Sequence, residues 1–168
     1  NCIYKNIVQK TDERILFRRE KDLKDFMILK LEYELEIKKN KNDKIRIFTD
    51  LTEEYIARNE IKEAKTILDE IKKLDKQNYS YYFYKGIVCK KEERIKEAIK
   101  NLEKAKKLGA EKEYPYIYEY LGFIYYEEGE LKKARKTLTK AMKTISDSPQ
   151  VYTVMALISL KEALLYCK

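Results

Sequence analysis

The chain has 168 residues and a formal net charge of +8, which is enough length for one domain or a short repeat array. Hydrophobic residues make up 44% and charged residues 39%, as expected for thin amphipathic helices, while only 4 Gly and 2 Pro disfavour many short strands. No apolar run is long enough to cross a bilayer, which excludes a transmembrane segment in this sequence. The absence of His excludes the usual Ser and Cys catalytic triads and most transition-metal sites.

The three cysteines give no sign of a cofactor or a metal site. Cys2, Cys89 and Cys167 lie far apart without metal-ligand or redox spacing, and their odd number leaves no complete disulfide framework. This usage slightly favours a reducing compartment such as the cytoplasm. The sequence starts at Asn1 rather than Met, so an exported protein, or one lipid-anchored through Cys2, stays open as an alternative.

The amino-terminal part carries two competing patterns. From Leu29 to Ile37 apolar residues alternate with charged ones, which indicates a strand. Helical spacing is also present, at Leu23, Met27, Leu31 and Leu35. Because Glu and Lys favour a helix over a strand, we predict a helix over 21–39. Residues 1–44 are then a helical segment that packs on the first repeat, and a further helix within 1–20 stays open.

From residue 45 onward the sequence repeats itself with a period of roughly 34 residues, which is typical of stacked helical hairpins. Ala64, Ala98 and Ala134 mark the repeat, and a leucine follows each of them by four positions. A small residue and an aromatic residue recur upstream of each alanine. These recurring positions are Thr52, Gly86 and Gly122, twelve residues upstream, and Phe48, Tyr82 and Tyr118, sixteen residues upstream.

Spacing and capping residues together predict a series of helices. Small residues where two antiparallel helices cross let the helices approach closely. Pro115 and Pro149 are expected in the first turns of helices, and Ser148, directly before Pro149, is expected to cap its helix. Gly109 and Gly129 are expected to follow helix ends. The predicted ranges are 44–57, 60–75, 79–91, 94–108, 115–127, 130–145 and 149–167.

The third unit shows the pattern most completely. It contains Tyr118, Leu121, Gly122, Tyr125, Gly129, Ala134, Leu138 and Ala141. This series resembles the tetratricopeptide-repeat (TPR) family. The resemblance implies an all-α fold, a right-handed superhelical stack of antiparallel helix hairpins (a TPR-like α-solenoid). It places three repeats at 45–78, 79–114 and 115–148 and a capping helix at 149–167, within a domain of residues 45–168.

The resemblance also implies a function. Members of this family usually bind extended or helical peptides in a concave groove lined by the first helices. We therefore expect a non-catalytic protein–protein interaction module, a scaffold or adaptor, whose protein or peptide partner offers an apolar or aromatic segment. By position the groove residues are Thr49, Glu53, Ile56, Phe83, Ile87, Lys90, Tyr116, Glu119, Phe123, Tyr126, Thr153 and Leu157, with Arg46, Ser80 and Leu160 beside them. For aromatic members such as Phe83 and Phe123, packing between hairpins is an equally weighted alternative.

Lysines line the second helices of units two and three. They are Lys96, Lys100, Lys104 and Lys107, then Lys132, Lys136, Lys140 and Lys143. A solvated face is favoured because Glu97, Glu103 and Glu111 are interleaved, and a basic strip for an acidic protein, a membrane surface or RNA is the alternative. Nucleic-acid binding is disfavoured because the basic residues are mostly Lys rather than Arg. Self-association through an uncapped end of the stack stays open.

Overall fold

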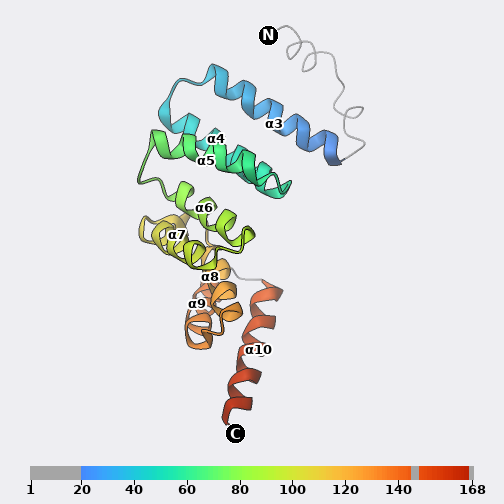
Figure 1. Cartoon of the computed structure of the whole chain (residues 1–168), viewed down its shortest axis with the longest axis vertical. Coiled ribbons are helices and arrows are strands. Elements are labelled where there is room, and N and C mark those ends of the chain that lie inside the picture. Colours follow the sequence, from blue (N-terminus) through green and yellow to red (C-terminus); the bar gives the residue numbers. More distant parts are fainter. Residues whose placement is uncertain (1–19, 145–147, 167–168) are drawn as a thin grey trace. The chain divides into compact units, whose positions relative to one another are not determined.

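The computed structural model describes residues 20–144 and 148–166, and all of its regular elements within these ranges are helical (Figure 1). The predicted helix over 21–39 is confirmed, and the strand alternative for this segment is wrong. Expectations for residues 1–19, including Cys2, and for Cys167 lie outside the described residues. The elements are α3 (Glu20–Ile37), α4 (Lys41–Ala57), α5 (Ile61–Leu74), α6 (Tyr79–Lys91), α7 (Ile95–Lys107), the 3-10 helix η1 (Ala110–Lys112), α8 (Ile117–Glu127), α9 (Leu131–Thr144) and α10 (Pro149–Tyr166).

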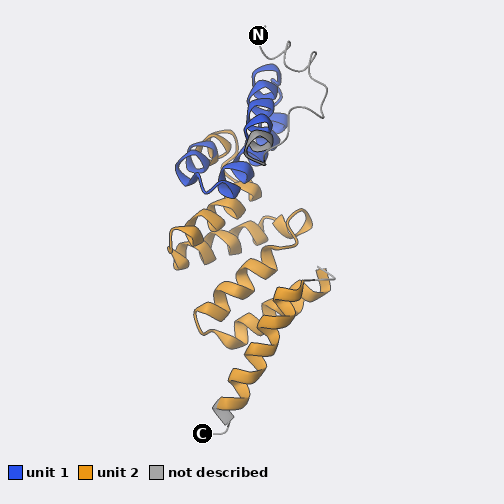
Figure 2. Ribbon diagram, turned by 90° about the vertical axis from the view of Figure 1, so that its right-hand side faces the viewer, with its two compact units in different colours: residues 1–67 blue, residues 68–168 orange. Residues whose placement is uncertain are grey.

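The chain separates into two compact units, residues 1–67 and residues 68–168 (Figure 2). The boundary falls inside α5. The repeat limits and the separate segment 1–44 that the sequence suggested therefore stay a prediction.

In the first unit α3 packs on α4, and their apolar faces meet through residues such as Leu31, Ile47 and Leu51. Thr52 takes the place of the repeat's small residue and is fully buried. Its hydroxyl donates to the Phe48 carbonyl at 2.7 Å, so the buried oxygen is satisfied within its own helix.

In the second unit α6 and α7 form one antiparallel hairpin, α8 and α9 form the next, and α10 packs on α8 and α9. Gly86 and Gly122 explain how closely the paired helices approach. A Cβ atom on Gly86 would lie 2.6 Å from Leu102 Cγ, and one on Gly122 would overlap Leu138. The sequence-based role of these glycines as close-approach positions is confirmed.

The same turn joins the two helices of each repeat. Its central residue has positive φ, at 61° in Asn59, 59° in Glu93 and 76° in Gly129. The next amide always donates back across the turn, as in Arg94 N to Cys89 O at 2.9 Å, and this bond closes a Schellman motif. Gly129 thus fulfils its predicted turn role, while Asn59 and Glu93 adopt the same backbone without being glycine.

The connection before α8 differs from the prediction. α7 ends as expected before Gly109, whose φ is 91°. The chain then forms η1, and the Ile117 amide donates to the Tyr114 carbonyl at 3.0 Å. Pro115 therefore lies in this turn, and α8 begins two residues later than the proline suggested.

Candidate functional site

On α4 the expected groove residues are mostly covered. Thr49 is buried and its hydroxyl donates to the Ile45 carbonyl at 2.8 Å. Ile56 is also buried, while Glu53 is exposed. Arg46 is exposed and forms ion pairs with acidic side chains of its own unit. Little apolar surface is accessible at these positions.

On α6 the aromatic residue expected in the groove packs against other aromatic side chains. Phe83 is only 4% exposed and stacks on Tyr114, with ring centroids 4.4 Å apart and planes 2° from parallel. Tyr120 meets it edge-on at 5.9 Å. Ser80 and Ile87 are buried, and Lys90 reaches Glu127 of α8 at 3.1 Å. Phe83 and Ile87 are therefore packed in the interior and do not line an open groove.

On α8 and α10 the expected groove residues are accessible. Phe123 and Tyr126 are half-buried and pack against a core cluster that includes Val151 and Ile158 of α10. Leu157 is 40% exposed and Leu160 is 58% exposed. We call Phe123, Tyr126, Thr153, Leu157 and Leu160 the α8–α10 surface.

Two further features mark this surface. From Ser148 to Leu160 no residue is charged, in a chain where 39% of residues are charged. The Nζ of Lys161 lies 4.2 Å from the centre of the Tyr126 ring, so the first charge after this stretch covers one edge of the surface. The remaining two expected groove positions of the third repeat differ: Tyr116, just before α8, is 55% exposed, and Glu119 accepts a hydrogen bond from Ser148 at 3.1 Å.

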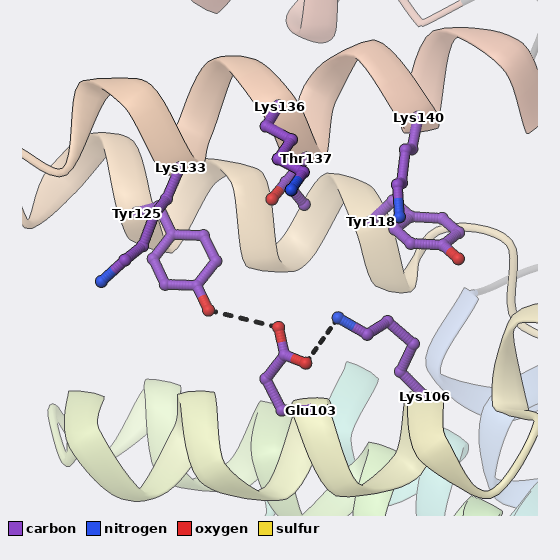
Figure 3. Close-up of a pocket in the computed structure, with 8 residues that line it drawn as sticks. All are labelled: Glu103, Lys106, Tyr118, Tyr125, Lys133, Lys136, Thr137 and Lys140. Atoms are coloured by element: carbon purple, nitrogen blue, oxygen red, sulfur yellow. Dashed lines mark hydrogen bonds and ion pairs between the residues drawn. The ribbon is translucent and has the colours of Figure 1, made fainter.

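A separate pocket opens between α7, α8 and α9 (Figure 3). Its volume is about 230 Å³. Glu103 lies at one side, where it accepts hydrogen bonds from Tyr125 Oη at 3.2 Å and pairs with Lys106 Nζ at 2.5 Å. Lys133 and Lys140 lie near the rings of Tyr125 and Tyr118. The lining residues are Glu103, Lys106, Tyr118, Tyr125, Lys133, Lys136, Thr137 and Lys140.

Burial and nearby carboxylates perturb the tyrosines of this pocket. Burial, followed by the charge of Glu103 and the hydrogen bond to it, raises the pKa of Tyr125 to about 12. Burial and the charges of Glu111 and Glu103 also raise the pKa of Tyr118. Both rings therefore stay neutral donors at physiological pH. Sequence reasoning missed the pocket, although the lack of any acidic residue in α9 was a visible signal.

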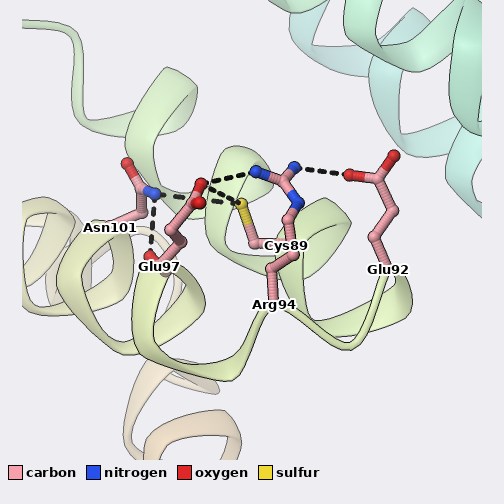
Figure 4. Close-up of polar contacts among 5 residues, drawn as sticks. All are labelled: Cys89, Glu92, Arg94, Glu97 and Asn101. Carbon is pink, nitrogen blue, oxygen red and sulfur yellow. Dashed lines mark hydrogen bonds and ion pairs between the residues drawn. The ribbon is translucent and has the colours of Figure 1, made fainter.

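The corresponding place in the preceding hairpin holds a polar cluster instead (Figure 4). Arg94 pairs with Glu92 and with Glu97, each at 2.5 Å, and Asn101 donates to the Glu97 carbonyl at 2.8 Å. Cys89 lies beneath them, fully buried, and burial raises the pKa of its thiol. The prediction that Cys89 packs in the interior is confirmed.

Within the described ranges, none of the helices combines the length and apolar character needed to cross a membrane. Among the same residues no three Cys, Asp or Glu side chains gather in an arrangement that would hold a metal ion.

Comparison with known proteins identifies the fold. The family model described as tetratricopeptide repeat matches residues 91–158. No curated protein matches the chain. MamA from Desulfovibrio magneticus RS-1 is similar in structure, with 19% identity, a TM-score of 0.64 and coverage of 96% of this chain and 85% of that one.

Two further solved structures have the same fold. One is the Yersinia enterocolitica type III secretion chaperone SycD in complex with a peptide of the translocator YopD, with 16% identity, a TM-score of 0.60 and coverage of 71% of this chain and 95% of that one. The other belongs to the APC/C hetero-tetramer Cut9–Hcn1, with 19% identity and a TM-score of 0.64; the match covers 70% of this chain and only 24% of that chain's length. With its repeat register, its hairpins and their glycine–leucine contacts, the chain has the all-α solenoid fold of tetratricopeptide-repeat proteins, and residues 91–158 match the model of that family.

Proposed function

We propose that this protein is an interaction module that binds an apolar or aromatic peptide segment at the α8–α10 surface. The observation that carries the proposal is the exposure of Leu157 and Leu160 on a helix face without charge. In a chain this rich in charged residues, large exposed apolar side chains that lie together favour a partner that covers them.

The spacing of these side chains fits a peptide ligand. Thr153, Leu157 and Leu160 follow one another at i, i+4 and i+7, so they lie in one row along α10. The half-buried rings of Phe123 and Tyr126 pack against the buried face of the same helix, and aromatic rings give a large contact area for little loss of rotamer entropy. A row of apolar residues beside aromatic rings offers pockets for the apolar side chains of an extended or helical segment.

The comparisons add support of a general kind. SycD, which has the same fold, was solved with a peptide of YopD. Peptide binding is therefore within the capacity of this arrangement of helices, although the low identity transfers neither the partner nor its binding residues. The expected groove positions on α4 and α6 do not enter the proposal, because Thr49, Ile56, Phe83 and Ile87 are buried.

A peptide library and a charged variant test the proposal. Peptides selected from a random library on the wild-type chain should contain two or more large apolar residues. The double variant Leu157→Asp/Leu160→Asp should weaken their binding at least about tenfold, because each peptide would have to desolvate two carboxylates. Binding is measured by fluorescence anisotropy.

Leu29→Asp provides the matched control. Leu29 is 55% exposed, a fraction similar to the 58% of Leu160, and it lies on α3, which contributes no residue to the α8–α10 surface. Circular dichroism should show native helix content for both variants, because the replaced side chains are exposed. If the selected peptides bind the double variant as tightly as the control, the proposed surface is wrong.

A further inference from the structure

The outward face of α9 has a charge pattern that its counterpart α7 lacks. α9 contains six basic residues and no acidic residue, whereas α7 alternates its lysines with Glu97 and Glu103. The glutamates that favoured a solvated face for the lysine rows, Glu97, Glu103 and Glu111, all lie in the second repeat and not on α9. We call the exposed residues Lys132, Lys136, Lys140 and Lys143 the α9 strip.

The lysines of the strip are not neutralised by the described part of the chain. The other two basic residues of α9 form ion pairs: Lys133 pairs with Glu130 at 3.3 Å, and Arg135 pairs with Glu162 at 2.6 Å. No described carboxylate lies within ion-pair distance of Lys136 or Lys140. The nearest interaction of Lys140 is with the Tyr118 ring, 5.7 Å from its centre.

From these observations we propose that the α9 strip binds an extended acidic protein segment, with the pocket of Figure 3 receiving one of its carboxylates at the rim formed by Lys136 and Lys140. This surface is independent of the α8–α10 surface, so either proposal can fail alone. The ligand class is a peptide with Asp or Glu at every second position.

The spacing supports an extended ligand. Residues four apart on a helix are separated by about 6 Å along its axis. Alternate side chains of an extended strand point the same way and are separated by roughly 6.6 Å. Carboxylates at every second position therefore match Lys132, Lys136 and Lys140 one to one.

The pocket also determines where a carboxylate would lie. Glu103 already accepts from Tyr125 and pairs with Lys106, so its charge is largely balanced. A ligand carboxylate is therefore expected at the side of the pocket where Lys136 and Lys140 lie, with the Thr137 side chain as a hydroxyl donor.

The pocket fits RNA or a membrane less well. Base readout and stacking rely on Arg and on open aromatic faces, but the pocket contains no Arg, and Lys133 and Lys140 lie by its two rings. A membrane-binding helix would present large apolar residues next to its lysines. The exposed positions of α9 are Lys or Thr.

Fluorescence anisotropy with labelled peptides tests the inference on the full chain. The probes are a twelve-residue peptide of alternating Asp and Ser, an isomer with all Asp residues in one block, and a single-stranded RNA of the same charge. The wild type should bind the alternating peptide more tightly than either other probe, and binding should weaken as salt rises.

The variant Lys136→Gln/Lys140→Gln should weaken binding of the alternating peptide about fivefold, as expected for the loss of two exposed ion pairs. Lys100→Gln/Lys107→Gln removes the same charge from exposed positions of α7 and should leave the affinity within about twofold. The inference is overturned if both double variants lose affinity equally, if the blocked isomer or the RNA binds as tightly as the alternating peptide, or if the wild type binds none of the probes.

Discussion

The hairpins α6–α7 and α8–α9 share a backbone but differ in what they place on it. Both contain a glycine against a buried leucine and both close with the same turn. At equivalent positions, thirty-six residues apart, Cys89 and Glu97 of the first correspond to Tyr125 and Lys133 of the second. One hairpin therefore buries a small thiol under a closed polar cluster, and the other holds a tyrosine over an open pocket.

The ion pairs at this place have opposite polarity in the two hairpins. Arg94 pairs with Glu97, three residues later, whereas the equivalent Glu130 pairs with Lys133. Tyr82 and Tyr118 show the same divergence: Lys104 Nζ donates to the Tyr82 hydroxyl at 2.6 Å, but the Nζ of the equivalent Lys140 lies 5.7 Å from the centre of the Tyr118 ring. The glycine–leucine contacts inside the hairpins are thus repeated, whereas the polar contacts of α7 and α9 differ between the two hairpins.

The repeated interior contact should respond most strongly to substitution. We expect Gly122→Val to destabilise the fold by about 3 kcal/mol, because the added methyl groups would overlap the fully buried Leu138. Gly86→Val should cost slightly less, since its contact with Leu102 is less tight. Urea unfolding measures both.

Leu138→Ala in the Gly122→Val background gives the control, because the smaller side chain relieves the overlap. The double variant should lose less free energy of unfolding than the two single variants lose together. Additive losses would show that the close approach is not what the glycine provides.

The second prediction concerns a position where the hairpins differ. Phe83 and Glu119 occupy equivalent places, but Phe83 is stacked on Tyr114 and Glu119 is half-exposed. Phe83→Ala should therefore destabilise by about 3 kcal/mol, and Glu119→Ala by less than about 1 kcal/mol. Equal losses in thermal unfolding would contradict the assignment of Phe83 to the core.

A smaller effect is expected at the turns. Glu93 adopts positive φ at a cost that glycine avoids, so Glu93→Gly should stabilise by about 0.5–1 kcal/mol. Gly129→Ala should destabilise by about 1 kcal/mol for the same reason. If both substitutions change the urea midpoint in the same direction, the two turns do not share a conformation in solution.

A further effect should appear only at high pH. Tyr125 has a pKa of about 12 in the folded chain against 10.0 as its ordinary value, so it favours folding fully below pH 10. Between pH 10 and about 12 the unfolded tyrosine ionises first, and this contribution is lost. Tyr125→Phe should therefore make stability fall less steeply over that range, as measured by urea unfolding, and an unchanged slope would contradict the assignment.

Local signals predicted the helices well. Capping residues, glycines and the apolar period are each read from a few neighbouring residues, and their positions agree with α3 to α10 within a few residues. Burial on α6 was harder to predict, because Phe83 is covered by Tyr114 from the connection after α7, which folds back through η1. The pocket was missed for a related reason: its lining comes from three helices, and no single segment shows them together.

The way the helices of the second unit meet also bears on how the protein folds. Each packing contact there joins helices that are adjacent or nearly adjacent in the sequence. Such local contacts need little loop closure, so folding can begin in either hairpin and spread to its neighbour. Weakening one hairpin should therefore populate partly folded chains in which the other persists, a behaviour that hydrogen exchange would resolve residue by residue.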